Sequence, residues 1–383
     1  MRKLCLLGAS GSIGQQTLDV INKNRDDFVL VSFSIGKQTR KISPIIKRFP
    51  SVKSICVLSK DKCKEYQKKY PHIKFCYGDE GLLSLINDDV DMVVNALVGF
   101  VGLKPTLYAL EQNKVVCLAN KEALVVGGEL VNKLLREGKG TLYPIDSEHS
   151  ALKKCLMVDD KNVDKLVLTA SGGAFRNLNR EQLTTVTKED ALKHPNWKMG
   201  NKITIDCATM VNKAFEIIEA HYLFGYPYEK IGVKLHDESY VHSYVKYKDG
   251  LMRLDISKPD MRNPIKLALY EFNIPFNTKV VTSLDSLSEF LFHDFDINRY
   301  PVIKYAEKVI KNKRGYGAVF NAANEVAVRA FLNDEIPFLM IEEIIDKCMS
   351  TYKNENVDNY DRLVEIDAKT RQIARKMIKD WRK

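Results

Sequence analysis

A glycine-rich turn near the amino terminus constrains the fold more than any other feature. The apolar run from Lys3 to Leu7 is typical of a strand, and Gln15 to Asn22 has the pattern of a helix. Between them lie Gly8, Gly11 and Gly14, each three residues from the next. This order is typical of a dinucleotide-binding βαβ unit, because glycines let the backbone approach a pyrophosphate at the helix amino terminus. Since the spacing differs from the commoner Gly-x-Gly-x-x-Gly, an ordinary strand-to-helix turn is the alternative.

The same alternation of strand and helix continues along the first third of the chain. Strand-like runs lie at 28–34, 54–58, 92–96 and 114–119, and helical patterns lie at 40–49, 60–69, 102–112 and 121–138. Regular alternation of this kind predicts a doubly wound parallel sheet. We therefore expect a Rossmann-like domain, of class α/β, over residues 1–149.

The loop after the second predicted strand indicates which dinucleotide this domain binds. NAD-specific sites carry a carboxylate about 20 residues beyond the glycines, where it holds the ribose 2′-hydroxyl. Here the loop contains Gly36, Lys37, Gln38 and Arg40 and no carboxylate. Cations favour a 2′-phosphate, so the loop predicts NADP; a lysine-rich loop in a lysine-rich protein is the alternative.

An acidic block follows the apolar run 142–145, which we interpret as a short buried strand. The block reads Asp146, Ser147, Glu148 and His149. If the chain stays extended there, the two carboxylates point to the same side. Neighbouring carboxylates repel each other unless a cation lies between them, and hard oxygen ligands suit Mg²⁺ or Mn²⁺. The block therefore predicts a metal site, with a solvated acidic turn as the alternative.

A helical segment farther along offers a third carboxylate. Asn212, Lys213 and Glu216 are spaced so that they can share one helix face. Glu216 would complete the ligand set of Asp146 and Glu148, while Asn212 and Lys213 would donate to a phosphate. A charge pair on a helix surface is the alternative.

Two loops between these acidic segments have the character of a ligand site. Ser171, Gly172 and Gly173 follow a predicted strand at 163–169 and offer a hydroxyl and open backbone N–H groups to an anion. Trp197 lies in a loop flanked by proline and glycine and is a plausible lid over that site. A plain turn and a tryptophan that anchors the loop to the core are the alternatives.

The remaining sequence predicts two further domains. We expect residues 150–290 to form an α+β catalytic domain with a mixed or antiparallel sheet. Alternating residues at 231–256 predict antiparallel strands there, with one face suited to a dimer. Residues 291–383 form a linker and a helical bundle with a structural role.

Composition limits the functional classes. A chain of 383 residues with 45% hydrophobic and 28% charged residues predicts two or three soluble domains, and no apolar run is long enough for a membrane span. The first strand begins within the first residues, which leaves no room for a targeting peptide, and eight scattered cysteines favour reduced thiols; we expect a cytoplasmic protein. The net charge of +10 lacks a dense basic block, which favours small anionic ligands over nucleic acid.

Taken together, the motifs resemble those of the 1-deoxy-D-xylulose 5-phosphate reductoisomerase family of the methylerythritol phosphate route to isoprenoids. The motifs occur in order along nearly the whole chain. They are Gly8–Gly14, Ile35–Lys37, Leu118–Glu122, Asp146–His149, Ser171–Gly173, His194–Trp197, Ala208–Lys213 with Glu216, and Phe320–Glu325.

The resemblance implies a homodimer that uses NADPH and a divalent metal, Mg²⁺, Mn²⁺ or Co²⁺, to convert 1-deoxy-D-xylulose 5-phosphate into 2-C-methyl-D-erythritol 4-phosphate, with no nucleic acid or membrane partner. The metal ligands would be Asp146, Glu148 and Glu216. The cofactor residues would be Ser10, Gly11, Ser12, Ile13, Gly36, Lys37, Gln38, Asn120, Glu122 and Gly200. The substrate residues would be Lys121, Ser147, Glu148, Ser171, His194, Trp197, Cys207, Asn212, Lys213 and Glu216. Among all of these, Lys121, Asp146, Glu148, His194 and Glu216 would be catalytic.

Three departures from the family pattern stand out. Cys207 replaces a usual serine at a phosphate contact, and a thiol is a weak donor. Gln38 replaces an asparagine, and residues 236–239 differ from the usual His-Pro-Gln-Ser. An ordinary NADP-dependent dehydrogenase, a reductoisomerase for another sugar phosphate, and a non-catalytic protein that binds nucleic acid or anions remain the competing hypotheses.

Overall fold

The computed structural model describes residues 1–197, 199–274 and 289–383, which form two compact units. The first unit contains Met1–Ala123, Val131–Asp146 and Met261–Ile274. The second contains Leu124–Leu130, Ser147–Asp260 and the described residues beyond 288. The boundary at Asp146 lies close to the predicted one at 149. The predicted boundary at 290 stays a prediction, because residues 275–288 beside it lie outside the described part.

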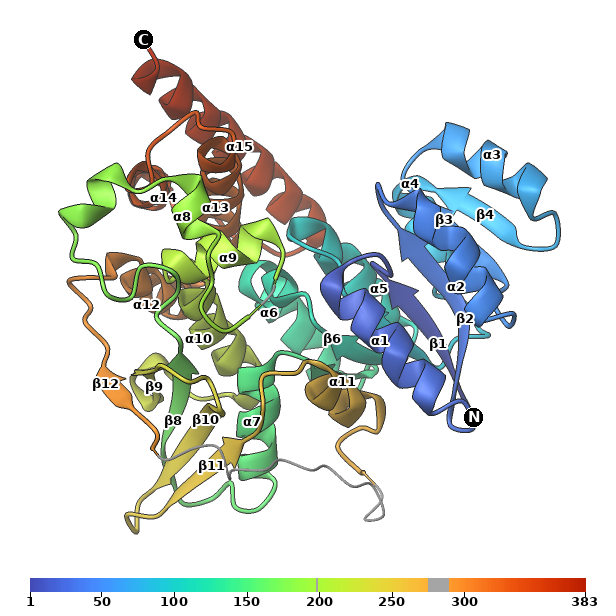
Figure 1. Ribbon diagram of the computed structural model, residues 1–383, viewed down its shortest axis with the longest axis horizontal. Coiled ribbons are helices and arrows are strands. Elements are labelled where there is room, and N and C mark those ends of the chain that lie inside the picture. Colours follow the sequence, from blue (N-terminus) through green and yellow to red (C-terminus); the bar gives the residue numbers. More distant parts are fainter. Residues whose placement is uncertain (198, 275–288) are drawn as a thin grey trace. The chain divides into compact units, whose positions relative to one another are not determined.

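The first unit is built on a seven-stranded parallel sheet of order β4-β3-β2-β1-β5-β6-β7 (Figure 1). The strands are β1 Arg2–Leu7, β2 Phe28–Ile35, β3 Ser54–Val57, β4 Lys74–Tyr77, β5 Met92–Asn95, β6 Val115–Leu118 and β7 Thr141–Pro144. The helices are α1 Ser12–Lys23, α2 Ile42–Arg48, α3 Lys60–Lys69, α4 Gly78–Ser84, α5 Leu103–Glu111, α6 Lys121–Arg136 and α11 Arg262–Leu269. The predicted doubly wound parallel sheet is confirmed.

Two parts of this unit were not predicted from the sequence. Strand β4 and helix α4 extend the sheet at one edge. Helix α11 returns to the unit from far along the chain, and Ile265, Ala268 and Leu269 join the core formed by the strands. Burial of these apolar side chains, at about 25 cal/mol per Å², is what holds α11 there.

The second unit contains a five-stranded sheet of order β11-β10-β8-β9-β12. The strands are β8 Val163–Ala170, β9 Ile231–His236, β10 Val241–Tyr247, β11 Met252–Ile256 and β12 Phe292–Asp294. Strands β8 and β9 are parallel and the other neighbours are antiparallel, so the predicted mixed sheet is confirmed.

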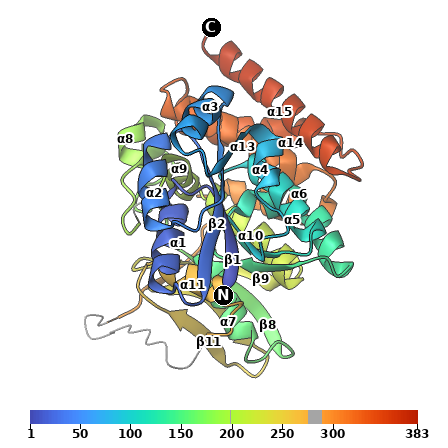
Figure 2. The same cartoon turned by 90° about the vertical axis from the view of Figure 1, so that its right-hand side faces the viewer.

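The helices of the second unit carry two of the three predicted metal ligands, Glu148 on α7 and Glu216 on α10. These helices are α7 Ser147–Leu156, α8 Lys188–Ala191, α9 Asn201–Ala208, α10 Val211–Phe224, α12 Lys304–Asn312, α13 Tyr316–Leu332, α14 Met340–Thr351 and α15 Tyr360–Trp381. Helix α13 contacts both α14 and α15, and Figure 2 shows the long α15 running beside these two helices. The predicted helical character of the last third is confirmed. Among the described helices, none has the length and apolar content needed to cross a membrane.

Candidate active site

The glycine turn in the first unit is shaped by backbone contacts. Gly8 has φ of +88°, and a Cβ there would lie 2.5 Å from the carbonyl oxygen of Ala96. A Cβ at Gly14 would lie 2.3 Å from the carbonyl oxygen of Gly8, whereas one at Gly11 would meet nothing closer than 3.6 Å. Only Gly8 and Gly14 are therefore required by space, since only glycine fits both approaches.

The turn leaves the amino terminus of α1 accessible. Gly11 is the N-cap of α1, and Gly11 and Ser12 are exposed while Ser10 and Ile13 are half-buried. The ammonium of Lys41 donates to the carbonyl oxygen of Ser10 at 2.9 Å, which places a positive charge beside the turn. An anion suits this position, because the free N–H groups of the first helical turn and the helix dipole both favour negative charge.

The loop after β2 lies beside this turn and presents its cations to solvent. The backbone N–H of Gly8 donates to the Ser34 hydroxyl at 2.9 Å, which joins the end of β2 to the glycine turn. Gly36 is half-buried, and the side chains of Lys37 and Gln38 are exposed. This arrangement fits a phosphorylated ribose, because the lysine can reach an added phosphate without losing a partner.

The segment at the start of α6 is tightly bonded within the first unit. Asn120 caps α6 by accepting from the Ala123 N–H at 3.0 Å, and its amide nitrogen donates to the Leu97 and Gly99 carbonyls, each at 3.0 Å, and to Glu122 at 3.1 Å. Asn120 and Glu122 are both buried. Their predicted role in cofactor binding stays a prediction, and their hydrogen bonds show that they also fix the loop after β5.

Lys121 and Asp146 form an ion pair with an N–O distance of 2.5 Å, and both side chains are about one-tenth exposed. Because a partly buried charge needs a partner, each residue holds the other in place. Asp146 is bonded directly to Ser147, the first residue of α7.

The three predicted carboxylates meet at this turn. One oxygen from each of Asp146, Glu148 and Glu216 lies within 4.8 Å of the others. The extended geometry predicted for 146–148 is wrong, because Ser147 begins helix α7 and Glu148 lies in its first turn. The helix dipole stabilises an acidic residue at that position. The turn of the chain, rather than strand alternation, brings the two carboxylates together.

Lys213 lies inside the carboxylate cluster. Its ammonium lies 3.1 Å from Glu148 Oε1 and donates to Glu216 and to the carbonyl oxygen of Thr169. The residue is 3% exposed, and although burial alone would lower the pKa of Lys213, the two glutamates raise it above its ordinary value. Lys213 is therefore a permanent cation that balances part of the acidic charge.

Asn212 and Ser147 complete the hydrogen bonds of the two glutamates. The Asn212 amide donates to Glu216 Oε1 at 2.5 Å, and the Ser147 hydroxyl donates to Glu148 Oε2 at 2.6 Å. Each carboxylate thus has one oxygen held by a neutral donor while Lys213 lies at the other. Such bonds fix the orientation of metal ligands, which hard divalent cations require.

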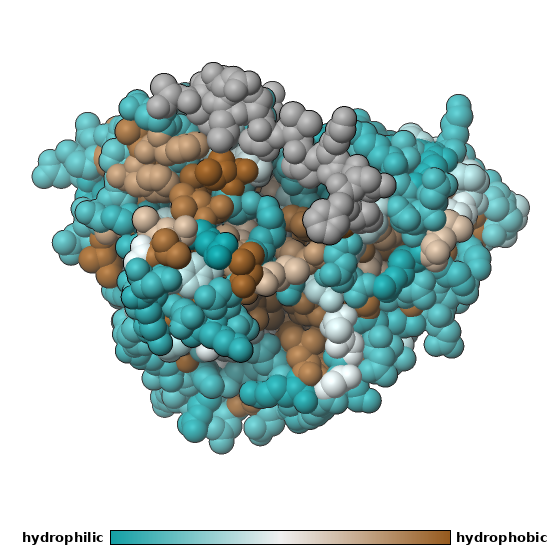
Figure 3. Space-filling view, turned by 90° about the horizontal axis from the view of Figure 1, so that it is seen from below, coloured by the Kyte–Doolittle hydropathy of each residue, from teal (hydrophilic) through white to brown (hydrophobic). Residues whose placement is uncertain are grey.

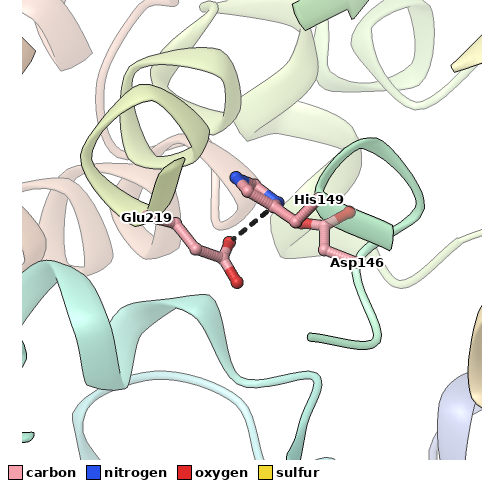
Figure 4. A group of neighbouring side chains, drawn as sticks. All are labelled: Asp146, His149 and Glu219. Atoms are coloured by element: carbon pink, nitrogen blue, oxygen red, sulfur yellow. Dashed lines mark ion pairs between the residues drawn. The ribbon is translucent and has the colours of Figure 1, made fainter. Parts of the chain in front are cut away.

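A buried histidine, His149, lies close to Asp146 and Glu219 (Figure 4). His149 Nε2 lies 2.9 Å from the carbonyl oxygen of Glu216, so this nitrogen carries the proton and donates. Its Nδ1 lies 3.5 Å from Glu219 Oε2, and both side chains are almost completely buried. Glu219 was not singled out from the sequence, although its position three residues after Glu216 on α10 is a signal that could have found it.

A second group of residues surrounds the loop after β8. His194 Nδ1 accepts from the backbone N–H groups of Asn196 at 3.2 Å and Trp197 at 3.0 Å, so the ring proton is on Nε2. His194 Nε2 lies 3.1 Å from the Ser171 hydroxyl oxygen and donates to it. Burial, assisted by the charge of Arg176, lowers the pKa of His194 to about 4. His194 is therefore neutral near pH 7.

This tautomer sets the role of Ser171. The hydroxyl oxygen of Ser171 accepts from His194 and from the Gly173 N–H at 3.3 Å, which leaves its own proton to donate to a ligand. A Cβ at Gly173 would lie 2.6 Å from the carbonyl oxygen of Cys207, so the loop packs against the end of α9. The backbone of the half-buried Cys207 therefore lies against Gly173, two residues after Ser171.

Helix α9, which carries Cys207, is fixed by a buried carboxylate. Asp206 is 3% exposed, and its oxygens accept from Lys202 at 2.7 Å and from Asn324 on α13 at 2.8 Å. Gly200, the N-cap of α9, is exposed. The half-buried Trp197 lies with its ring centre 6.3 Å from that of His242. Lys198, which follows Trp197 in the chain, lies outside the described residues.

Comparison with known proteins gives concordant results over the chain. Models of 1-deoxy-D-xylulose 5-phosphate reductoisomerase match residues 4–128, its C-terminal domain matches 142–224, and a further DXP reductoisomerase C-terminal domain matches 256–373. A protein of that name from Bacillus cereus (strain AH187) is 44% identical over 381 residues, covering 99% of this chain and 100% of the relative. One from Bacillus subtilis (strain 168) is also 44% identical, over 383 residues.

Solved structures with the same fold are similar over the full length. The 1-deoxy-D-xylulose 5-phosphate reductoisomerase of Zymomonas mobilis in complex with NADPH has a TM-score of 0.90 and 34% identity, covering 98% of this chain and 99% of the other. A DOX-P reductoisomerase in complex with NADPH, fosmidomycin and magnesium has a TM-score of 0.92 and 33% identity, covering 99% and 98%.

Proposed function

Because the chain belongs to the 1-deoxy-D-xylulose 5-phosphate reductoisomerase family, we propose which of its residues carry the family reaction. The chain isomerises 1-deoxy-D-xylulose 5-phosphate and reduces the product with NADPH to 2-C-methyl-D-erythritol 4-phosphate, with the help of a divalent metal. The observation that carries the residue assignment is the cluster of Asp146, Glu148 and Glu216, within 4.8 Å of one another.

The carboxylate cluster has the chemistry of a magnesium or manganese site. Asp146, Glu148 and Glu216 offer hard oxygen donors. An ion pair with Lys121 and hydrogen bonds from Ser147 and Asn212 orient them. A divalent metal held there supplies a Lewis acid that polarises the ketone of the substrate. Lys213 and Lys121 keep the three carboxylates close together without strong mutual repulsion.

The loop after β8 is proposed to hold the substrate phosphate. Ser171 has a hydroxyl proton to donate, Cys207 lies across the packed loop, and neutral His194 fixes the direction of the Ser171 bond. Binding of a remote phosphate lowers the barrier when its energy is used to close the site, and Trp197 is the side chain proposed to exclude water on closure.

The glycine turn is proposed to hold NADPH, which supplies the hydride. Ser10 to Ile13 would receive the pyrophosphate, and Lys37 and Gln38 would contact the 2′-phosphate. Asn120, Glu122 and Gly200 keep their predicted cofactor role as part of the same proposal. The exposure of Lys37 and the open amino terminus of α1 support this assignment.

A homodimer is proposed from apolar side chains on and beside the edge strands of the second sheet. Leu251, Met252 and Leu254 near β11 and Leu291 and Phe292 near β12 are each more than one-third exposed. Figure 3 shows several groups of hydrophobic side chains on one face. Exposed apolar patches of this kind mark association surfaces. Replacement of Leu254 by Asp should shift the mass in solution from dimer to monomer, and an unchanged mass would exclude this surface.

The function is tested by NADPH oxidation with 1-deoxy-D-xylulose 5-phosphate, with and without a chelator. We expect turnover that is abolished by the chelator and restored by Mg²⁺ or Mn²⁺. Equal turnover with other ketose phosphates would show a reductoisomerase of different specificity. Turnover that survives exhaustive chelation would exclude the metal role of the carboxylate cluster.

A further inference from the structure

A concave basic groove lies in the C-terminal helical region, between α13 and α15, which run side by side (Figure 2). Its volume is about 420 Å³. Five cationic side chains line it, and the only carboxylates among its lining residues are those of Glu325 and Glu335. The cations are Arg329, Arg371, Arg375, Lys379 and Arg382. None of these residues belongs to the site proposed for the reaction.

Four of the five cations lie along one side of α15. Arg371, Arg375, Lys379 and Arg382 follow one another at intervals of four, four and three residues, which places them on one helix face. Arg329 of α13 lines the same groove. Like charges at these spacings repel one another, so the arrangement destabilises the bare helix unless opposite charge is nearby.

Close ion pairs lie at the two ends of the groove. Arg371 is paired with Glu325 at 2.7 Å and with Asp367 at 2.6 Å, and Arg382 lies 3.7 Å from Glu335. These pairs fix one guanidinium firmly and hold the second loosely.

The cations between those pairs make no close ion pair among the described residues. In the described part of the chain, no carboxylate lies within 4.0 Å of the side-chain nitrogens of Arg329, Arg375 or Lys379. The middle of the groove is therefore positive, with cations from both helices.

The floor and position of the groove limit what it can bind. Val326, Ala330 and Ile378, all buried, form an apolar floor that cannot offer hydrogen bonds to a ligand from its side chains. Arg329 and Lys379 lie in the last turns of their helices, where a cation also complements the helix dipole. Arg375 lies farther from the end of α15, so the dipole does not account for it.

We propose that this groove binds a small soluble multivalent anion of the phosphate or diphosphate class. Guanidinium groups bind such oxyanions through paired N–H donors, and a lysine adds a point charge. The apolar floor leaves room for a short carbon portion beneath the anionic group. The ligand thus meets three cations from two helices and relieves the repulsion along α15.

The proposal is tested with inorganic diphosphate as the probe, on the full chain at constant ionic strength, by isothermal titration calorimetry. The groove variant is Arg375→Gln with Lys379→Gln. The control is Lys369→Gln with Lys376→Gln, which removes the same charge from exposed positions on the same helix that do not line the groove. We expect about a tenfold loss of affinity in the groove variant and less than about a twofold loss in the control.

Three results would overturn the proposal. Equal losses in the two variants would show a general effect of net charge. Unchanged binding in the groove variant would place the diphosphate elsewhere. Retention of the chain on phosphatidylglycerol vesicles that is lost only in the groove variant would show a membrane surface rather than a small soluble ligand. Circular dichroism of both variants checks that they fold as the parent does.

Discussion

The glycine turn after β1 and the carboxylate cluster at the start of α7 depend on different physical interactions. The turn depends on backbone fit: Gly8 and Gly14 admit contacts that any side chain would block. The carboxylate cluster depends on charge balance: Glu148 and Glu216 stay close because Lys213 lies between them. A substitution should therefore act on folding in the first case and on chemistry in the second.

The largest effect on kcat is expected for a substitution in the carboxylate cluster. Glu216→Gln keeps the shape of the side chain but removes one of the proposed metal ligands, so kcat should fall by about a thousandfold. Calorimetric titration with Mn²⁺ should show weakened metal binding, while NADPH affinity should stay within about twofold of the parent.

Full activity of Glu216→Gln with added Mg²⁺ would show that the carboxylate cluster does not hold the metal. A large loss of NADPH affinity would also contradict the contrast between the turn and the cluster, since the substitution would be acting on the fold. The conservative change at Glu148, Glu148→Gln, should show the same separation of metal and cofactor binding.

Backbone fit in the glycine turn gives the next largest effect. Gly14→Ala places a Cβ 2.3 Å from the Gly8 carbonyl oxygen, so the turn must shift. We expect a loss of about 1–3 kcal/mol in the free energy of unfolding, measured in urea, together with weaker NADPH binding.

Gly11→Ala is the matched control, because a Cβ there would have ordinary contacts. It should cost less than about 1 kcal/mol, as expected for a change at an N-cap. Equal losses for the two variants would show that the turn is sensitive to any substitution and that the close approach at Gly14 is not decisive.

The same contrast explains what could be predicted from the sequence. The turn of 8–14 is local, so glycine spacing and the flanking apolar runs predicted it. The cluster was identified by residue type, but its geometry was misjudged. Asp146 directly before Ser147, with Glu148 in the first turn, is the pattern of a helix start, so the extended chain ends before Ser147.

The features that the sequence did not predict depend on contacts between charged or apolar residues far apart in the chain. The ammonium of Lys213 lies among carboxylates, which no local pattern reveals, and its predicted contact with a phosphate stays a prediction. Strand β4 is only four residues long and partly exposed, so it has little hydrophobic periodicity. Helix α11 packs on strands more than 100 residues away in the sequence, and only the folded core shows why.

Cofactor selectivity tests the first unit without disturbing its backbone. Lys37 is exposed, so Lys37→Glu should leave stability unchanged. Loss of one cation and gain of an anion should weaken NADPH by about tenfold or more while NADH changes little. The ratio of kcat/KM for the two cofactors measures this. An unchanged ratio would show that Lys37 does not contact the 2′-phosphate.

A smaller effect is expected at the phosphate loop of the second unit. Cys207→Ser replaces a weak thiol donor with a hydroxyl at the end of α9, whose backbone packs against Gly173. One added neutral hydrogen bond is worth about 1 kcal/mol, so KM for the sugar phosphate should fall about fivefold with kcat nearly constant. Cys207→Ala is the control and should match the parent; a rise in KM there would mean that the thiol already contributes.

The effect that is smallest near pH 7 concerns the charge state of His194. Its pKa is lowered to about 4 in the folded chain, below the unfolded value of about 6.5. As pH falls below about 6.5, the unfolded chain takes up a proton that the folded chain does not, so stability falls until pH reaches about 4. Above pH 6.5 both states are neutral and the histidine has no such effect.

The free energies of unfolding of the parent and of His194→Gln, measured in urea, should therefore differ by a constant amount above pH 7. Between pH 6.5 and 5 the free energy of unfolding of the parent should fall relative to that of the variant. Parallel curves over that range would mean that His194 is protonated in the folded state, and then its Nδ1 could not accept the two backbone N–H groups that hold the loop.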